Sequence, residues 1–257
     1  MPEVRLRARS VSEIVDASIE LYRRDAGRYI LFTAFAITPQ VITQILVQPG
    51  AKFGLDTVLL ALASLCVAAF TFTMGSAAVM KYGAAVYLGE PADVEATLRS
   101  VIPKVGTIMW AEFLKGILYF LGFFAFFIGG FYVLARFFAV NAAIVLEDAS
   151  AVEAFARSSA LSSGRKRHVL NTLLLVWIIY ILLSGCILVV TTTVKSQALG
   201  IVLGSAYQIV AYPIFGLATM LLYYDCRIRS EGFDIERMAA SLGSGPTGQP
   251  GIAGAAS

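Results

Sequence analysis

Residues 169–194 read VLNTLLLVWIIYILLSGCILVVTTTV and contain no charged side chain. At 1.5 Å per residue, a helix over this stretch would span about 39 Å, more than the roughly 30 Å of hydrocarbon in a bilayer. A helix also satisfies its backbone hydrogen bonds internally, as hydrocarbon requires. The stretch therefore predicts a transmembrane helix.

The rest of the chain has the same character. It has 257 residues, of which 58% are hydrophobic and 14% charged, and its mean hydropathy is +0.77. Soluble domains carry about 25% charged residues, so this composition excludes an ordinary soluble enzyme and a disordered chain. Four more stretches have no charged residue, namely 29–51, 57–80, 116–135 and 196–224. We predict an all-α, polytopic membrane helix bundle.

Residues 105–146 are mostly apolar. As a helix they would extend about 63 Å, which is enough for two crossings with almost no loop. We predict a turn at Gly129-Gly130, because glycine accepts the backbone angles of a reversal. A re-entrant hairpin is the alternative. The six predicted spans lie near residues 29–48, 55–80, 105–128, 131–147, 169–193 and 199–224.

Basic residues decide the predicted orientation. With a cytoplasmic N-terminus, 16 of the 20 lysines and arginines fall in cytoplasmic segments, and only Lys52 and Lys195 fall in outer loops. This asymmetry follows the positive-inside rule and places both termini in the cytoplasm. Membrane topology explains the basic residues, so no nucleic-acid partner is expected. The membrane domain is 1–240, and the Gly-, Ser- and Ala-rich residues 241–257 are expected to form a disordered cytoplasmic tail.

An amphipathic helix is predicted before each pair of spans. Ser10 with Glu13, and Ser150 with Glu153, have the spacing of a capping box. The apolar stripes have helical spacing, and such helices are expected to lie at the headgroup level with the apolar face in the membrane. We predict a threefold repeat of amphipathic helix plus hairpin; the alternative is that any cytoplasmic turn before a span is amphipathic and capped. The three stripes are Val11, Ile14, Val15, Ile19 and Tyr22; Val94, Leu98, Val101 and Val105; and Val152, Phe155, Ala156 and Ser159.

Three stretches resemble a bacterial membrane-protein family, the glycerophosphoryl diester phosphodiesterase membrane domain, with its YciC-like relatives. They are residues 17–24 (ASIELYRR) with Pro39; Arg136, residues 144–147 (IVLE), Ala154, Arg157, Ser158, Leu161 and Gly164; and residues 223–234 (YYDCRIRSEGFD). The resemblance implies a six-helix membrane module of poorly defined role. Longer relatives carry a separate soluble phosphodiesterase domain. Too few residues follow Tyr224 to form one, so no hydrolase activity is expected.

Charged residues inside the spans are the sharpest functional signal. A charge at the centre of a bilayer costs about 2.5–3.5 kcal/mol, so such residues are expected to pair inside the bundle. We predict a buried polar site in which Glu112 contacts Arg136, with Lys115 either extending toward the membrane surface or sharing the carboxylate. It would either bind an anionic substrate or proton, or fix the helix register. Asn141 is expected to hydrogen-bond between helices.

Two further sets of residues are candidate contact sites. The first is a basic cluster expected to contact anionic lipid headgroups, formed by Arg165, Lys166, Arg167 and His168. The second is a charged segment after the last span, which either docks a partner or is a solvated stop, formed by Asp225, Arg227, Arg229, Glu231 and Asp234. His168 is the single histidine, and no motif for a metal, cofactor or catalytic triad is recognised.

These observations favour a non-catalytic integral membrane protein of the bacterial cytoplasmic membrane. It would act as a scaffold, accessory or regulatory module with a membrane or cytoplasmic protein partner. The alternative is a transporter or lipid-handling protein that uses the buried charges. A polar cavity between the spans would favour the alternative, and a fully packed bundle would oppose it.

Overall fold

The computed structural model describes residues 7–46, 54–125, 127–194 and 196–236, and this part of the chain is helical without strands. The prediction of an all-α fold is confirmed. In chain order the helices are α1 (Val11–Arg24), α2 (Ala26–Leu46), α3 (Leu55–Leu88), α4 (Val94–Val101), the short 3-10 helix η1 (Ile102–Lys104), α5 (Val105–Ala125), α6 (Phe127–Arg136), α7 (Val140–Glu147), α8 (Ala151–Ser162), α9 (Lys166–Val194) and α10 (Gln197–Glu231).

Five helical segments of the described residues are long and apolar enough to cross a membrane, as expected of a multi-pass membrane protein. The predicted first span, 29–48, corresponds to α2, which is not among the five, and its residues 47 and 48 lie outside the described part. The tail 241–257 also lies outside it. The five segments are Leu55–Leu88, Val94–Phe124, Ile128–Glu147, Lys166–Thr193 and Ala198–Glu231.

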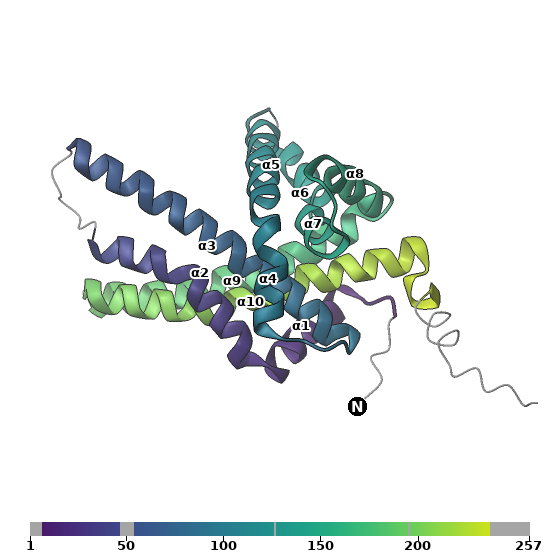
Figure 1. The fold of residues 1–257 in the computed structure, drawn as a ribbon, viewed down its shortest axis with the longest axis horizontal. Coiled ribbons are helices and arrows are strands. Elements are labelled where there is room, and N and C mark those ends of the chain that lie inside the picture. Colours follow the sequence, from purple (N-terminus) through teal and green to yellow (C-terminus); the bar gives the residue numbers. More distant parts are fainter. Residues whose placement is uncertain (1–6, 47–53, 126, 195, 237–257) are drawn as a thin grey trace, which may run out of the picture.

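The long helices form hairpins that diverge from a common base. The α2–α3 and α9–α10 hairpins lie side by side and extend in one direction, whereas the α5–α6 hairpin projects in another (Figure 1). The base holds α1, α4, α7, α8 and the last turns of α3 and α10. We call it the basic end because it carries most of the arginines. Fully buried side chains such as Tyr29, Tyr82 and Tyr223 lie toward this end. Toward the hairpin tips, large apolar side chains such as Leu65 and Leu188 are exposed, as a lipid-facing surface requires.

Helices form at all three positions where an amphipathic helix is predicted, and the apolar face of α1 packs on protein. Both capping boxes are present, at Ser10 with Glu13 and at Ser150 with Glu153, and Asp93 caps α4. In α1, Ile14 is fully buried on a face that packs against α9 and α10. The expectation that this apolar face lies in the membrane is therefore wrong for α1, because neighbouring helices cover it.

Helix α8 buries a different face from the predicted one. Val152, which belongs to the predicted stripe, is 78% exposed, whereas Ala154, Ser158 and Leu161 are buried. Small side chains on the buried face let α8 approach the chain between α6 and α7, where it makes hydrogen bonds that apolar side chains would not supply.

The predicted span 131–147 is two helices. α6 ends at Arg136, α7 begins at Val140, and the three residues between them form a turn. The freed backbone groups are satisfied by α8: Ser158 Oγ donates to the Arg136 carbonyl at 2.9 Å and accepts from the Ala139 amide at 3.0 Å. Irregular backbone inside a membrane protein needs such partners, because lipid provides none.

The predicted turn at Gly129-Gly130 is also wrong. Both glycines lie inside α6, which runs from Phe127 to Arg136. A Cβ atom on Gly130 would lie 2.4 Å from the ring of Phe123, and one on Gly129 would lie 2.9 Å from the carbonyl oxygen of Gly122. These glycines are needed for the close approach of α5 and α6 rather than for a reversal.

The last helix is longer than its predicted span. α10 continues past residue 224 to Glu231 and has 35 residues, which is about 52 Å and well over one bilayer thickness. The charged segment that follows the predicted span is therefore mostly helical. Its side chains are held at fixed positions on α10, where they contact α1, α8 and α9.

Candidate functional site

A polar triad lies where the hairpins diverge. Lys115 on α5 donates from Nζ to Glu112 Oε1 at 2.8 Å and to Asn141 Oδ1 at 3.1 Å. Asn141, on α7, in turn donates from Nδ2 to Glu112 Oε1 at 2.6 Å. Of the two positions considered for Lys115, the structure has the one in which it shares the Glu112 carboxylate, and Asn141 bonds between helices as expected.

The predicted contact between Glu112 and Arg136 is not formed. Arg136 donates from Nε to Ser159 Oγ at 3.0 Å and stacks over the ring of Phe137, at 5.5 Å from its centroid. The prediction assumed an unbroken helix that would bring Arg136 to the level of Glu112. Because the helix ends at Arg136, this side chain turns to α8, and Asn141 on the next helix reaches Glu112.

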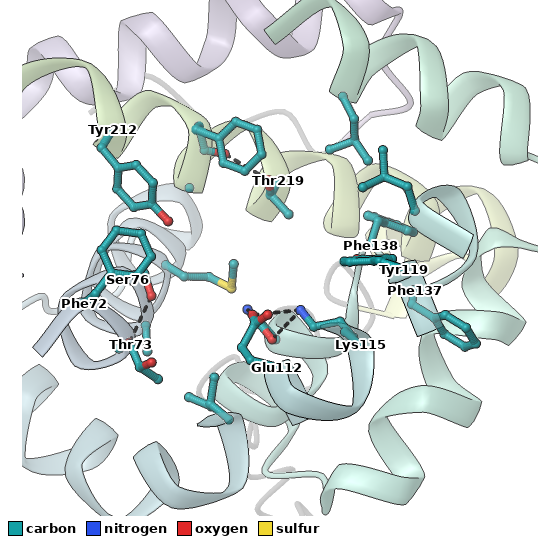
Figure 2. A pocket seen from close by; sticks show the side chains of 18 residues that line it. Phe72, Thr73, Ser76, Glu112, Lys115, Tyr119, Phe137, Phe138, Tyr212 and Thr219 are labelled. Atoms are coloured by element: carbon teal, nitrogen blue, oxygen red, sulfur yellow. Dashed lines mark hydrogen bonds and ion pairs between the residues drawn. The ribbon is translucent and has the colours of Figure 1, made fainter. Parts of the chain in front are cut away.

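The triad borders a cavity of about 210 Å³ between α3, α5, α10 and the α6–α7 break; we call it the crevice. Thr73, Ser76 and Thr219 also line it. Figure 2 shows Glu112 and the hydroxyl of Tyr212 facing the same open space. Its aromatic lining is formed by Phe72, Tyr119, Phe137, Phe138, Tyr212 and Phe215.

The two charges of the triad differ in their access to the crevice. The side chain of Lys115 is 8% exposed and that of Glu112 is 45% exposed. Burying an ammonium is costly unless it is paired and hydrogen-bonded, and Lys115 has both an ion pair and an amide acceptor. The carboxylate is therefore the charged group that a molecule in the crevice meets first.

Comparisons with protein-family models, with curated proteins and with solved structures give no match for this chain.

The predicted basic cluster points largely at protein. Arg165 donates from Nη2 to the carbonyl of Arg229 at 2.7 Å, and His168 Nε2 lies 3.0 Å from Asp225 Oδ2. Lys166 lies over the ring of Tyr132, at 4.6 Å from its centroid. Only Arg167 of the four is exposed. The cluster therefore positions α9 against α6 and α10, and Arg167 is left as its most accessible cation.

Asp225 is a buried anchor for the N-terminal segment. Its side chain is 1% exposed and pairs with Arg229 Nε at 2.8 Å as well as with His168. Its Oδ1 accepts the backbone N–H of Arg9 at 2.6 Å, and Arg229 Nη2 donates to the Arg9 carbonyl at 2.7 Å. The predicted docking segment thus makes mostly intramolecular contacts, which fasten the start of α1 to α9 and α10.

A second network at the basic end joins α7, α8 and α10. Arg157 makes a bidentate pair with Glu147, with Nε and Nη2 both 2.7 Å from the carboxylate oxygens, and also pairs with Glu231. Arg227 lies 3.1 Å from Glu231, and Tyr223 donates to Glu147. Hydrogen bonds to the carboxylates of Glu147 and Glu231 raise the pKa of Arg157 above its usual value.

The site includes groups that the sequence did not single out. Tyr212 and Thr219 lie about 100 residues from Glu112 in the chain, and no periodicity or spacing links them. The α6–α7 break brings Phe137 and Phe138 into the same wall, beside Asn141. Among the described residues, no group of His, Cys, Asp and Glu has the arrangement to hold a metal ion.

Proposed function

We propose that this chain is a non-catalytic, multi-pass protein of the bacterial cytoplasmic membrane that binds an amphiphilic molecule, such as a lipid, in the crevice. The observation that carries this proposal is a cavity lined by both a Glu–Lys–Asn triad and aromatic rings, at the point where three apolar hairpins diverge. A fully packed bundle would have no such space. The Lys115 ammonium that lines the crevice is already held by Glu112 and Asn141, and we assign the crevice to binding.

The proposed topology has six spans, with α2 as the first and both termini in the cytoplasm. Three features support it. The chain returns to the basic end after α2–α3, after α5 with α6–α7, and after α9–α10, and one amphipathic helix precedes each of these units. The basic end also carries most of the arginines. The order α1, α4, α8 before the three pairs also supports the proposed repeat. The resemblance to the phosphodiesterase membrane domain agrees with a six-span module. We do not propose a hydrolase activity for this chain from that resemblance.

Retention of lipid during purification tests the binding proposal. Ser76→Phe places a ring in the crevice, whereas Ser64→Phe makes the same change on the same helix at a site that does not line it. The two serines are matched, because each donates to the carbonyl three residues earlier, at 2.9 Å. Lipid is extracted from the purified protein in mild detergent and quantified by mass spectrometry. We expect Ser76→Phe to lose bound lipid and Ser64→Phe to keep it. Equal amounts of bound lipid in the two variants would refute the proposal.

A scaffold or accessory role is the second candidate. It is favoured by large apolar side chains exposed at the basic end, Val152 on α8, Ile102 in η1 and Ile235 after α10, which are 78%, 53% and 68% exposed. A photo-crosslinking residue at Val152 tests it, with the same residue at Leu188 near the hairpin tip as the control. Protein adducts formed at 152 and absent at 188 would support a partner; lipid adducts alone at both positions would oppose it.

A further inference from the structure

We infer that the crevice recognises an ammonium group, carried by an amphiphile whose apolar part lies against the surrounding helices. The inference rests on the proposed function and specifies its ligand. The shared chemistry is a protonated amine on an apolar body, which either an aminophospholipid of the bilayer or a free long-chain amine would supply.

The accessible charge of the crevice is negative. Glu112 Oε1 accepts hydrogen bonds from both Lys115 and Asn141, while Oε2 accepts none from the described residues. A carboxylate has about four lone-pair sites, so Glu112 retains acceptor capacity on Oε2. An N⁺–H donor would fill that capacity with a charge-assisted hydrogen bond, which is stronger than a neutral one.

An anionic headgroup fits the crevice less well. Lys115 is the triad's cation, but its side chain is 8% exposed, against 45% for Glu112, and two acceptors of the triad already engage its ammonium. A phosphate or carboxylate approaching from the open side therefore meets the negative Glu112 before it reaches Lys115. Like charges within a few ångströms repel strongly where water is scarce.

The aromatic lining favours the same class of ligand. A cation is attracted to the face of an aromatic ring within about 6 Å of its centroid, and aromatic cages recognise quaternary ammonium groups in this way. The rings of Phe72 and Tyr212 lie 4.8 Å apart between centroids and belong to α3 and α10, so they approach the crevice from two helices. Tyr212 adds a hydroxyl with no hydrogen-bond partner in the described part of the chain, and it faces the space beside Glu112 (Figure 2).

The size of the crevice indicates a headgroup rather than a whole lipid. Its 210 Å³ is below the roughly 300–1,000 Å³ of pockets that enclose drug-sized ligands. An acyl chain would therefore remain outside, against the exposed apolar side chains of the spans. Burial of each CH₂ group against such a surface contributes favourably to binding, while the polar groups select the headgroup.

Native mass spectrometry of the purified full chain tests this inference. The protein in mild detergent is given equal amounts of phosphatidylethanolamine and phosphatidylglycerol with identical acyl chains, and separately dodecylamine or dodecanol. We expect phosphatidylethanolamine to bind about tenfold more tightly than phosphatidylglycerol, and dodecylamine more tightly than dodecanol. If dodecylamine binds more tightly than dodecanol but the two phospholipids bind equally, the ligand is a free amine. If phosphatidylethanolamine also binds more tightly than phosphatidylglycerol, a bilayer lipid can supply the ammonium group.

Two sets of variants tie the preference to the crevice. Glu112→Gln leaves Lys115 buried without a counter-charge, so the double variant Glu112→Gln/Lys115→Met, which removes both charges, is measured beside it. Phe72→Leu removes a ring face without changing charge, and Phe113→Leu, on an exposed side chain outside the crevice lining, is its control. We expect the amine preference to fall toward unity in the double variant, to weaken in Phe72→Leu and to persist in Phe113→Leu.

The outcomes separate this inference from the proposed function. Tighter binding of phosphatidylglycerol, or equal binding of the two phospholipids without a preference for dodecylamine over dodecanol, overturns the ammonium inference. If Ser76→Phe still blocks that binding, the crevice remains a lipid site. Equal binding of dodecylamine and dodecanol would mean that the site recognises a neutral hydrogen-bond donor, and it also overturns the ammonium inference. Binding that Ser76→Phe does not reduce overturns both proposals.

Discussion

Replacing Ser158 by alanine removes the contact that closes the α6–α7 break. The hydroxyl is fully buried, accepts from the Ala139 amide at 3.0 Å and donates to the Arg136 carbonyl at 2.9 Å. In Ser158→Ala the amide loses its acceptor, and a buried donor without a partner costs about 1–3 kcal/mol. The carbonyl keeps a hydrogen bond from Ser162 at 3.3 Å, so it adds little. We therefore expect a loss of about 2 kcal/mol.

The change is measured as the midpoint of thermal unfolding in detergent, followed by intrinsic fluorescence. For a chain of this size, about 2 kcal/mol corresponds to a fall of roughly 4–8 °C. Ser163→Ala is the matched control, because Ser163 is exposed and lies just beyond the same helix. Because the break also positions Phe137 and Asn141 in the crevice wall, lipid retention should fall with stability. An unchanged midpoint in Ser158→Ala would refute the role given to this serine.

Three further changes have distinct expected results. Gly130→Ala should lower the free energy of unfolding by about 1–3 kcal/mol, and with it the unfolding midpoint, because its Cβ would lie 2.4 Å from an aromatic ring. Gly185→Ala, with open space around it, should leave the midpoint unchanged. A backbone hydrogen bond from Ser10 lowers the pKa of Glu13 to about 2, so the stabilisation from this carboxylate is present above about pH 4.5 and is lost as the pH falls toward 2. The difference in midpoint between wild type and Glu13→Gln should therefore be constant from pH 7 to 5 and vanish near pH 2; a difference independent of pH would contradict this. Asp225→Asn should raise hydrogen exchange in α1 by more than tenfold, because the anchor of the N-terminal segment is weakened, and unchanged exchange would disprove the anchor.

Apolar length and helix capping were readable from the sequence because they depend on neighbouring residues. The charge-free stretch 169–194 lies wholly within α9, and the capping boxes at Ser10 and Ser150 form as their spacing predicts. Glu112 and Lys115 are three residues apart on one helix, so their ion pair, one of the two positions considered for Lys115, depends on local spacing.

Features that depend on packing between distant helices were not readable. Nothing near Arg136 in the chain marks the helix break, because the groups that stabilise it, Ser158 and Ser162, belong to α8. The Gly129-Gly130 pair fits a turn as well as a close helix contact, and only the position of Phe123 decides between them. His168 was assigned to a headgroup-facing cluster because its partner, Asp225, lies 57 residues away.

A structure determined in a lipid bilayer disc that contains phosphatidylethanolamine tests the central claim most directly. The account predicts an elongated density that enters the crevice, with its polar end beside Glu112 and Tyr212 and its apolar end against the exposed faces of the spans. A crevice that holds only water, or is closed by its own side chains, while lipid density lies elsewhere on the protein would contradict it.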